Sequence, residues 1–330
     1  MTAPGIDLIA RRRQRAAAQS GLSRERRAVL IVNTRSRKGE RGYARAKHLL
    51  ELAGVTLEAS YPVRSAERLP EIVQAEVEKG RTLIIVGGGD GTISSVVDAF
   101  AYRATVFGLL PLGTANSFAR SLEIPLDLEG AVDVIAHGKV ADVDLGSING
   151  DLFANGAAIG LPAAIARATP HSMKRWLGRL AYPLVALSRL ANHPAFECTI
   201  SADGLSRSVW TLDVAIAIGG HQGGAEVAPD ANVDDGHVLV QVLKSTSKRR
   251  FLARWTRIAL RLPTRSDDLE ITKAASLTIA CAPPQDVSID GEVVARTPID
   301  VGIAREALLV MVPQAFDDED DADPSLQNDP

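Results

Sequence analysis

The stretch Arg81–Ser95 reads RTLIIVGGGDGTISS, and it predicts a strand, a glycine turn and a helix in immediate succession. The apolar run Leu83–Val86 is short and β-branched, which favours a buried strand. Four of the next five residues are glycine, and beyond Thr92 apolar residues recur at helical spacing as far as Phe100. A turn without side chains that leads into a helix lets backbone N–H groups approach an anion closely. We therefore expect a phosphate-binding turn here.

Asp90 lies inside this turn, where a carboxylate would repel a phosphate. We expect it to act through Mg²⁺ or to position the loop, and not to bind phosphate directly. The turn is not a Walker A loop, because no Gly-Lys-Ser/Thr follows, and it lacks the last glycine of G-x-G-x-x-G. Taken alone, it could be an ordinary tight connection between a strand and a helix.

Two further polar loops follow apolar strands in the first part of the chain. Strands are expected at Ala28–Val32, Thr56–Val63 and Thr105–Leu110, each followed by a helical pattern. This alternation predicts a parallel, doubly wound α/β sheet, whose ligands bind at the carboxyl ends of the strands. The loops there would present Asn33, the glycine turn and the stretch Gly113-Thr114-x-Asn116 at one edge.

The pattern changes to antiparallel β after a helix at Leu128–Ala136. Hairpin dipeptides such as Asn149-Gly150 separate short apolar runs. The expected strands are Val140–Ile148, Gly150–Ile159, Phe196–Ala202, Ser208–Ile218, Val238–Leu243, Ser276–Ala280 and Val287–Ile289. Helices are expected at Ser172–Ala191 and Lys248–Leu262, and a last strand at Ala307–Val312.

Composition excludes several classes of protein. The 330 residues contain no apolar run long enough for a bilayer and no signal-peptide pattern at the start, so we expect a cytoplasmic protein. Cys198 and Cys281 are far apart in sequence and show no metal-ligand spacing, which indicates buried, inert thiols. Aromatic residues are few and do not interleave with basic ones, so nucleic acid is not an expected partner.

Charge is concentrated at the two ends of the chain, although the net charge is only −3. Residues 1–27 are rich in arginine and residues 315–330 in aspartate, and segments of this kind are usually solvated and flexible. A basic N-terminus, or the cationic amphipathic helix Lys248–Leu262, could instead touch anionic lipid at the inner face of the membrane.

The motifs, taken in order, resemble the diacylglycerol kinase catalytic-domain family, especially its soluble bacterial members. The matching stretches are Gly88-Gly89-Asp90-Gly91-Thr92, Pro111-x-Gly113-Thr114-x-Asn116-x-Phe118-Ala119-Arg120, Asp144-Leu145-Gly146, Phe153-x-Asn155, Ile159-Gly160, Pro229-x-Ala231-x-x-x-Asp235-Gly236 and Asp290-Gly291-Glu292. They cover roughly residues 28–313. The GGDGT stretch also occurs in NAD kinases and phosphofructokinases, so the later motifs single out the lipid kinases.

The resemblance implies a two-domain layout with the active site in the cleft between the domains. Residues 28–137 and 303–314 would form the nucleotide-binding α/β domain, of the NAD kinase and phosphofructokinase type. Residues 138–302 would form a β-sandwich-like lipid-substrate domain.

The implied activity is transfer of the γ-phosphate of ATP to a hydroxyl of a lipid such as diacylglycerol. By resemblance, the ATP-binding residues are Asn33, Gly88, Gly89, Asp90, Gly91, Thr92, Gly113, Thr114 and Asn116. Asp290 would be the general base, assisted by Glu292 and by Asp90, while Asp235 matches a Mg²⁺ position. The lipid would be presented at a membrane surface. A homodimer stays open, because family members are sometimes dimers, and the sequence does not choose the lipid.

Some positions depart from the family pattern. Ser95 and Ser117 stand where acidic residues are usual, and Thr34 replaces a proline. Two alternatives stay open. The shared GGDGT stretch allows an NAD kinase-like enzyme with a soluble substrate, and the two serines in place of acids allow a nucleotide- or lipid-binding regulator of low catalytic activity.

Overall fold

The computed structural model describes residues 7–35, 37–65, 67–168, 190, 193–222, 225–226, 232–259, 268–289 and 292–317. The chain forms two compact units. The first comprises residues 1–145, 232–236 and 304–330, and the second comprises residues 146–231 and 237–303. The expected boundary at residues 137/138 is therefore displaced to 145/146. The expected helix Ser172–Ala191 lies almost wholly outside the described residues.

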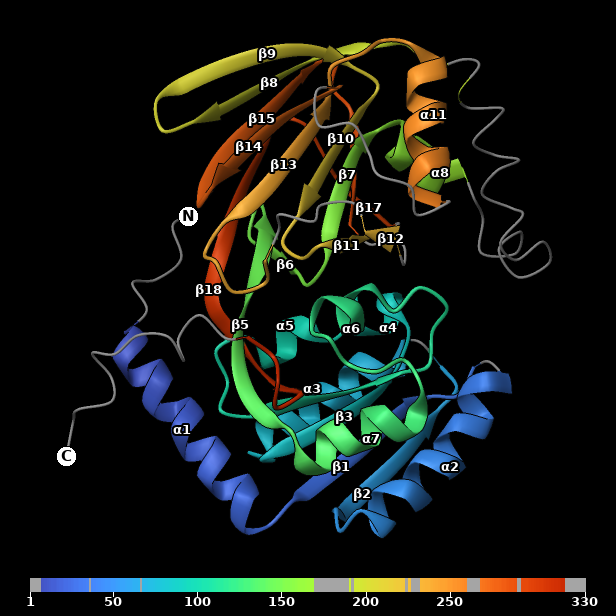
Figure 1. The fold of residues 1–330 in the computed structure, drawn as a ribbon, viewed down its shortest axis with the longest axis vertical. Coiled ribbons are helices and arrows are strands. Elements are labelled where there is room, and N and C mark those ends of the chain that lie inside the picture. Colours follow the sequence, from blue (N-terminus) through green and yellow to red (C-terminus); the bar gives the residue numbers. More distant parts are fainter. Residues whose placement is uncertain are drawn as a thin grey trace. The chain divides into compact units, whose positions relative to one another are not determined.

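The first unit is an α/β domain with a parallel sheet (Figure 1). Its helices are α1 Leu8–Arg24, α2 Arg37–Leu52, α3 Arg68–Glu78, α4 Asp90–Ser94, α5 Val97–Phe100, α6 Ser117–Ser121 and α7 Leu128–His137. Its strands are β1 Arg27–Asn33, β2 Thr56–Val63, β3 Leu83–Gly88, β4 Val106–Pro111, most of β5 Lys139–Ile148 and the end of β18 Ile299–Val312.

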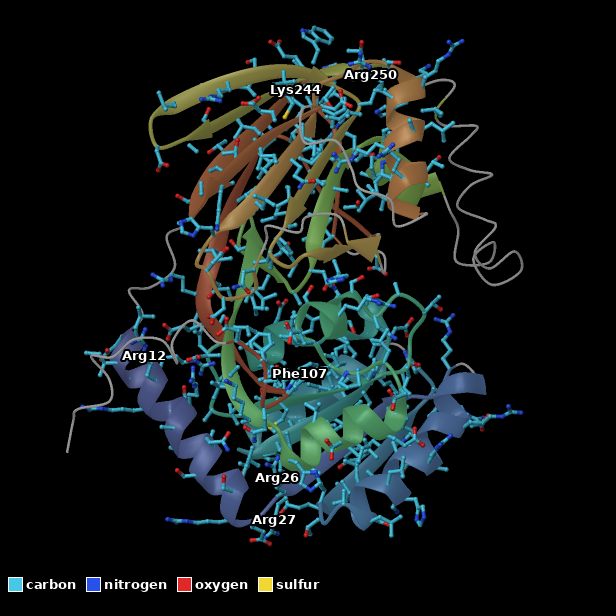
Figure 2. All side chains as sticks on the ribbon, in the orientation of Figure 1. Arg12, Arg26, Arg27, Phe107, Lys244 and Arg250 are labelled. Atoms are coloured by element: carbon cyan, nitrogen blue, oxygen red, sulfur yellow. The ribbon has the colours of Figure 1, made fainter. Side chains whose placement is uncertain are left out.

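The strand order in this unit is β2-β1-β3-β4-β18, and every one of these pairings is parallel. Strands β3 and β4 are buried along their whole length, as expected for a sheet covered on both faces. Helix α2 packs against α7, and α3 packs against α5. Phe107 of β4 meets Phe100 of α5 edge to face, with ring centroids 4.8 Å apart. Figure 2 labels Phe107. The predicted α/β sheet is confirmed.

The second unit is built from two larger antiparallel sheets and a separate two-stranded one. Its strands are β6 Asp151–Phe153, β7 Gly156–Gly160, β8 Phe196–Ala202, β9 Leu205–Thr211, β10 Asp213–Ala217, β11 His221–Gln222, β12 Ala225–Glu226, β13 Val238–Leu243, β14 Leu269–Ala274, β15 Ser276–Ala282, β16 Asp286–Ile289 and β17 Glu292–Arg296, and its helices include α8 Leu161–Ala168 and α11 Lys248–Ala259. One larger sheet runs β14-β13-β10-β7-β16-β17, and in the other β15 pairs with β18, with β8 and through it with β9.

The core of the second unit draws buried side chains from both of its larger sheets. Ile200 and Ile279 come from one sheet, and Val214 and Val240 from the other. Apolar faces packed in this way are the pattern of a β-sandwich. The predicted antiparallel β domain is confirmed.

Three expected elements are divided in the structure. The helix expected after the glycine turn is two short helices, α4 and α5, with Val96 at the break in a non-helical conformation. The strand expected at 150–159 is interrupted between β6 and β7. The strand expected at 208–218 is divided between β9 and β10, which pair in different sheets. The sequence pattern did not reveal these breaks. The segments on both sides of each break are partly buried, so apolar residues occur on both sides.

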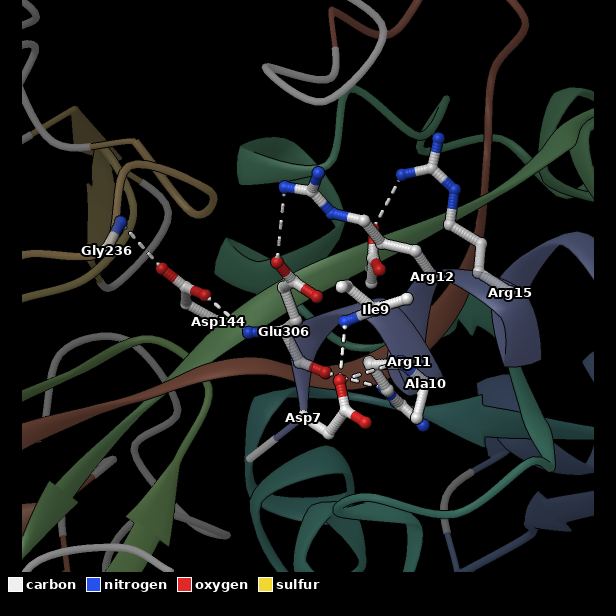
Figure 3. Close-up of polar contacts among 10 residues, drawn as sticks. Asp7, Ile9, Ala10, Arg11, Arg12, Arg15, Asp144, Gly236 and Glu306 are labelled. Atoms are coloured by element: carbon white, nitrogen blue, oxygen red, sulfur yellow. Dashed lines mark hydrogen bonds and ion pairs between the residues drawn. The ribbon is translucent and has the colours of Figure 1, made fainter. Parts of the chain in front are cut away.

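The N-terminal segment differs most from its expectation. Residues expected to be flexible form helix α1, which buries Ala18 and Leu22 and begins at the N-cap residue Asp7. Arg11 is buried as well, and its guanidinium donates to the carbonyl oxygens of Arg103, Glu306 and Ala307. Figure 3 shows Arg11 beside Glu306. Arg11 thus bonds main-chain carbonyls instead of solvent, although Arg13 and Arg24 on the same helix are exposed.

Two more arginines of α1 face buried carboxylates. Arg15 forms an ion pair of 2.6 Å with Asp142, whose side chain is fully buried on β5. Arg12 lies 3.8 Å from the carboxylate of Glu306 (Figure 3). Charges removed from water need such partners, so α1 belongs to the folded unit.

The C-terminal tail also begins later than expected. Phe316 is buried, and the Gln314 side chain donates to the carbonyl of His137. Most of the acidic residues that follow lie outside the described residues. Within the described part of the chain, no helix is both long enough and apolar enough to cross a membrane.

Replacing Arg11 with alanine should destabilise the first unit. The change removes three hydrogen bonds to main-chain carbonyls, so we expect a loss of about 3 kcal/mol in the free energy of unfolding. Urea unfolding followed by circular dichroism measures it. Arg13→Ala, an exposed arginine on the same helix, is the matched control and should change stability by less than about 0.5 kcal/mol. Equal effects of the two changes would contradict the anchoring role.

Candidate functional site

The loops predicted to bind a ligand begin at the same edge of the parallel sheet. Gly88, the last residue of β3, pairs with Pro111, the last residue of β4. Asn33 ends the neighbouring strand β1. The carboxyl ends of these strands therefore bring the predicted loops together, as parallel topology requires.

Asn33 connects the first loop to the glycine turn. Its side-chain amide donates to the hydroxyl of Thr92 over 3.0 Å, and its side-chain oxygen accepts from the backbone N–H of Arg35. Thr92 in turn lies so close to Gly88 that a Cβ there would come within 2.6 Å of the threonine side chain. The two ends of the turn are thus held together by contacts that only glycine permits.

Gly89 and Gly113 bring two loops into backbone contact. A Cβ added to Gly113 would lie 2.4 Å from the Cα of Gly89, and one added to Gly89 would lie 2.9 Å from the Cα of Gly113. Neither position can carry a side chain without moving a loop. This close approach explains why both loops contain glycine at these positions.

The carboxylate of Asp90 positions the second loop. It accepts from the backbone N–H of Ser117 over 2.6 Å and, more weakly, from that of Phe118 over 3.4 Å. It therefore caps the first turn of α6 from outside the helix. Burial raises the pKa of Asp90, and the hydrogen bonds from Ser117 and Phe118 oppose this shift. These contacts are those of a positioning residue, while contact with Mg²⁺ stays a prediction.

Asn116 supports the same loop from within. It adopts a left-handed conformation with φ 49°, and its side-chain oxygen accepts from the N–H of Gly113 over 2.9 Å. Its amide donates to the carbonyls of Pro111 and Gly113. This side chain is buried, and its hydrogen bonds are made to atoms of its own loop, so its role is to shape the turn. Thr114, at the tip, is exposed.

A small pocket of about 160 Å³ opens beside these loops. Gly88, Gly89 and Asp90 line one part of it, and Leu109 and Phe118 line another.

The two serines that replace acidic residues of the family pattern make structural contacts. The hydroxyl of Ser95 donates to the carbonyl of Thr92 over 2.8 Å. Ser117 is buried, and its N–H contacts Asp90. Both serines therefore stabilise the turns on either side of the candidate site.

The predicted metal residue Asp235 lies on the loop 232–236, which belongs to the first unit. Gly236, with φ 69°, donates its N–H to the carboxylate of Asp144 over 2.8 Å, and the N–H of Glu306 donates to the other oxygen over 2.7 Å (Figure 3). Burial raises the pKa of Asp144 to about 6, and these two N–H groups oppose the shift. The negative charge of Asp235 also raises it.

Asp144 is a residue whose role sequence reasoning missed. It appeared only as part of the Asp144-Leu145-Gly146 motif, whereas the structure makes it the support of the loop that carries Asp235. Its position between Val143 and Leu145 on a largely buried strand was the available signal, because a buried acid needs partners.

The side chains near Asp235 are of the type that binds a hard divalent cation, but they are too few to complete its coordination. Carboxylate oxygens of Asp144 and Asp235 are the ligand type that Mg²⁺ prefers. Among the described residues, however, no group of three or more His, Cys, Asp or Glu side chains could hold a metal ion. Backbone carbonyls or water would have to complete such a site.

The predicted catalytic triplet is only partly described. Asp290 and Gly291 lie outside the described residues. Glu292 begins β17, pairs with Ile289 of β16 and is exposed. It belongs to the second unit, whereas the glycine turn belongs to the first. The described residues therefore bring together Asn33, the glycine turn and the Gly113–Asn116 loop, and they do not test the role of the triplet.

Removing the Asp90 carboxylate should loosen the second loop. We expect Asp90→Ala to lower the free energy of unfolding by about 1–2 kcal/mol, because two backbone N–H groups lose their acceptor. Asp90→Asn keeps an acceptor oxygen and should cost less. Thermal unfolding of both variants measures the difference. Equal losses for Asp90→Asn and Asp90→Ala would mean that the charge, and not the hydrogen bond, holds the loop.

Two family models match the chain, and between them they include most of it. Residues 27–148 match the diacylglycerol kinase catalytic domain. Residues 156–312 match the YegS C-terminal NAD kinase beta sandwich-like domain. The boundary between the two matches agrees with the change from the parallel sheet to the antiparallel sheets.

Similar proteins include bacterial diacylglycerol kinases. The diacylglycerol kinase of Staphylococcus haemolyticus is 30% identical over 257 residues, which cover 76% of each chain. That of Staphylococcus aureus is 29% identical over 282 residues, covering 83% of this chain and 88% of the relative. A crystal structure of a candidate diacylglycerol kinase from Bacillus anthracis superposes with a TM-score of 0.73 at 25% identity, over 88% of this chain and 98% of the other.

Proposed function

The chain belongs to the diacylglycerol kinase family, and on that premise we propose that it transfers the γ-phosphate of ATP to a hydroxyl of a lipid such as diacylglycerol. The observation that carries the proposal is the pair of touching loops at Gly89 and Gly113, held by Asp90, at the carboxyl edge of the sheet. Phosphoryl transfer depends mainly on positioning and on offsetting phosphate charge. A rigid turn without side chains is suited to that task.

The proposed ATP-binding surface consists of backbone and small polar groups. The turn Gly88–Thr92 would face the phosphates, and Thr114 at the exposed loop tip would contact the nucleotide. Asn33, Asp90 and Asn116 would act by holding these loops in place, since their side chains are engaged in loop contacts. Asp235, supported by Asp144, is the proposed Mg²⁺ ligand. When bound, Mg²⁺ would offset negative charge on the phosphates.

The proposed general base is Asp290, with Glu292 beside it. A carboxylate near the lipid hydroxyl can accept its proton as the oxygen attacks phosphorus. Ile289, which precedes Asp290, is buried on β16, while Glu292 is exposed at the start of β17. The triplet thus follows a buried strand and leads into an exposed one.

Of the two basic segments, α11 is the one we propose to meet the membrane that presents the lipid. Arg11, Arg12 and Arg15 of α1 are engaged with acids or carbonyls of their own unit. Arg249 and Arg250 on α11 are exposed, as is the apolar Leu252 (Figure 2 labels Arg250). Exposed cations beside an apolar side chain suit an anionic lipid surface.

The test is phosphate transfer from γ-labelled ATP, with Mg²⁺, to lipids in mixed micelles. The panel contains diacylglycerol, a sphingoid base, a ceramide and a glycolipid, with NAD in a parallel reaction without detergent. We expect a labelled lipid product that disappears with EDTA. Label in NADP alone would replace the proposal with an NAD kinase activity. We include this test because the second unit matches an NAD kinase beta sandwich-like domain. ATP binding without any product would indicate a regulator.

Replacing Asp290 with asparagine should abolish turnover. The variant keeps the size of the side chain but removes the proton acceptor, so we expect a loss of about 10²–10⁴-fold in kcat with ATP affinity and Tm unchanged. The matched control is Asp286→Asn, on β16 in the same segment, which should keep full activity. Full activity of the Asp290 variant would remove Asp290 as the base.

A further inference from the structure

The two cysteines of the chain, far apart in sequence, face each other across a pair of strands. Cys198 of β8 is paired directly with Cys281 of β15 in antiparallel register. Residues opposite each other in such a pair have Cα atoms about 4.5–5.5 Å apart. Disulfides need Cα separations of about 4.4–6.8 Å. Hydrogen-bonded and non-hydrogen-bonded pairs of opposite residues both fall within this range.

Both thiols lie on the same face of the sheet. Along β8 the buried positions are Phe196, Cys198 and Ile200, and along β15 the alternate residues Leu277 and Ile279 point into the same core that Cys281 borders. The side chains of the two cysteines form a hydrogen bond with each other. The neighbouring pair Ile279 and Ile200 fixes the register, so the contact does not depend on a flexible loop.

The two thiols have unequal environments. Cys198 is 1% exposed, whereas Cys281 is partly exposed and can meet a small oxidant from solvent. The thiol of Cys198 and the hydroxyl of Thr297 both donate to the Cys281 sulfur and lower the pKa of Cys281. Donation to Cys281 and burial raise the pKa of Cys198. Since the thiolate is the reactive form, Cys281 is the sulfur that reacts first.

We propose that Cys281 and Cys198 form a reversible redox pair that closes to a disulfide when the protein meets a hydroperoxide. The Cys281 thiolate attacks the peroxide oxygen, breaks the O–O bond and becomes a sulfenic acid, and the leaving hydroxide takes up a proton to give water. The Cys198 sulfur then attacks the Cys281 sulfur, the S–O bond breaks, and the oxygen leaves as water with the proton of Cys198. Overall, two thiols are oxidised and one hydrogen peroxide is reduced to two waters.

The consequence is a covalent bond between β8 and β15 within the second unit. The bond joins segments on either side of α11, β13 and β14, so it constrains a long stretch of the unfolded chain. The oxidised protein should therefore unfold at a higher temperature than the reduced protein. A small thiol such as dithiothreitol would restore both thiols.

The experiment exposes the folded, reduced full-length protein to hydrogen peroxide and follows it by intact mass and peptide mapping. We expect a product lighter by two hydrogens, with a linked peptide pair containing Cys198 and Cys281, and a raised Tm that dithiothreitol reverses. Neither readout requires lipid kinase activity, so failure here and failure of the proposed kinase function are distinguishable.

Three variants test the assigned order of reaction. Cys198→Ser should accumulate a sulfenic acid at Cys281, trapped by dimedone, and Cys281→Ser should keep Cys198 unmodified under the same exposure. Thr297→Val, which removes one donor to Cys281, should slow oxidation several-fold. The proposal is overturned if the folded wild type keeps both thiols while its urea-unfolded form reacts, or if only intermolecular disulfides form. Equal reactivity of the two single cysteines would overturn the order.

Discussion

The first unit depends on one buried carboxylate that joins three separate pieces of chain. Asp144 lies on β5, and its two oxygens accept N–H groups from Gly236 and Glu306, each from a different segment of the unit. Without an acceptor between them, two backbone donors would be buried and unpaired, at roughly 1–3 kcal/mol each. The loop with Asp235 is therefore held in the first unit by side-chain chemistry as well as by chain connectivity.

A second constraint of the same kind shapes the candidate site. The loops after β3 and β4 touch through glycine backbones, and Asp90 reaches across that contact to the start of α6. Two polar side chains of the predicted ATP-binding set, Asn33 and Asn116, are directed at neighbouring loop atoms. The site thus uses its motif residues largely to fix backbone geometry, which leaves backbone N–H groups and exposed small side chains for the ligand.

Sequence alone predicted the architecture well where the local sequence pattern agrees with the place of the segment in the tertiary structure. Strands β2, β8 and β13 were predicted with the bounds they have, because a charged residue follows the apolar or alternating pattern of each. The loops at Asn33, Gly89 and Gly113 were placed at one edge for the same reason, since parallel strands must end together.

Other features depend on contacts between residues distant in sequence, and pattern could not show them. The role of Asp144 requires Gly236 and Glu306, and the pairing of Cys198 with Cys281 requires the register of two strands that no turn connects. The two cysteines were predicted to be inert because only their spacing was visible. Helix α1 was predicted to be flexible because its arginines looked solvated, while their partners lie more than a hundred residues away.

Helix α1 and the buried acid Asp142 also bear on how such a protein could diverge. Arg15 neutralises a carboxylate that has no access to water, so Arg15 cannot be lost alone without leaving a buried charge. A lineage that shed the N-terminal helix would have to replace the acid on β5 in the same period, and one that acquired the acid would have to retain the helix. Helix α1 and the buried acid on β5 would thus be inherited together.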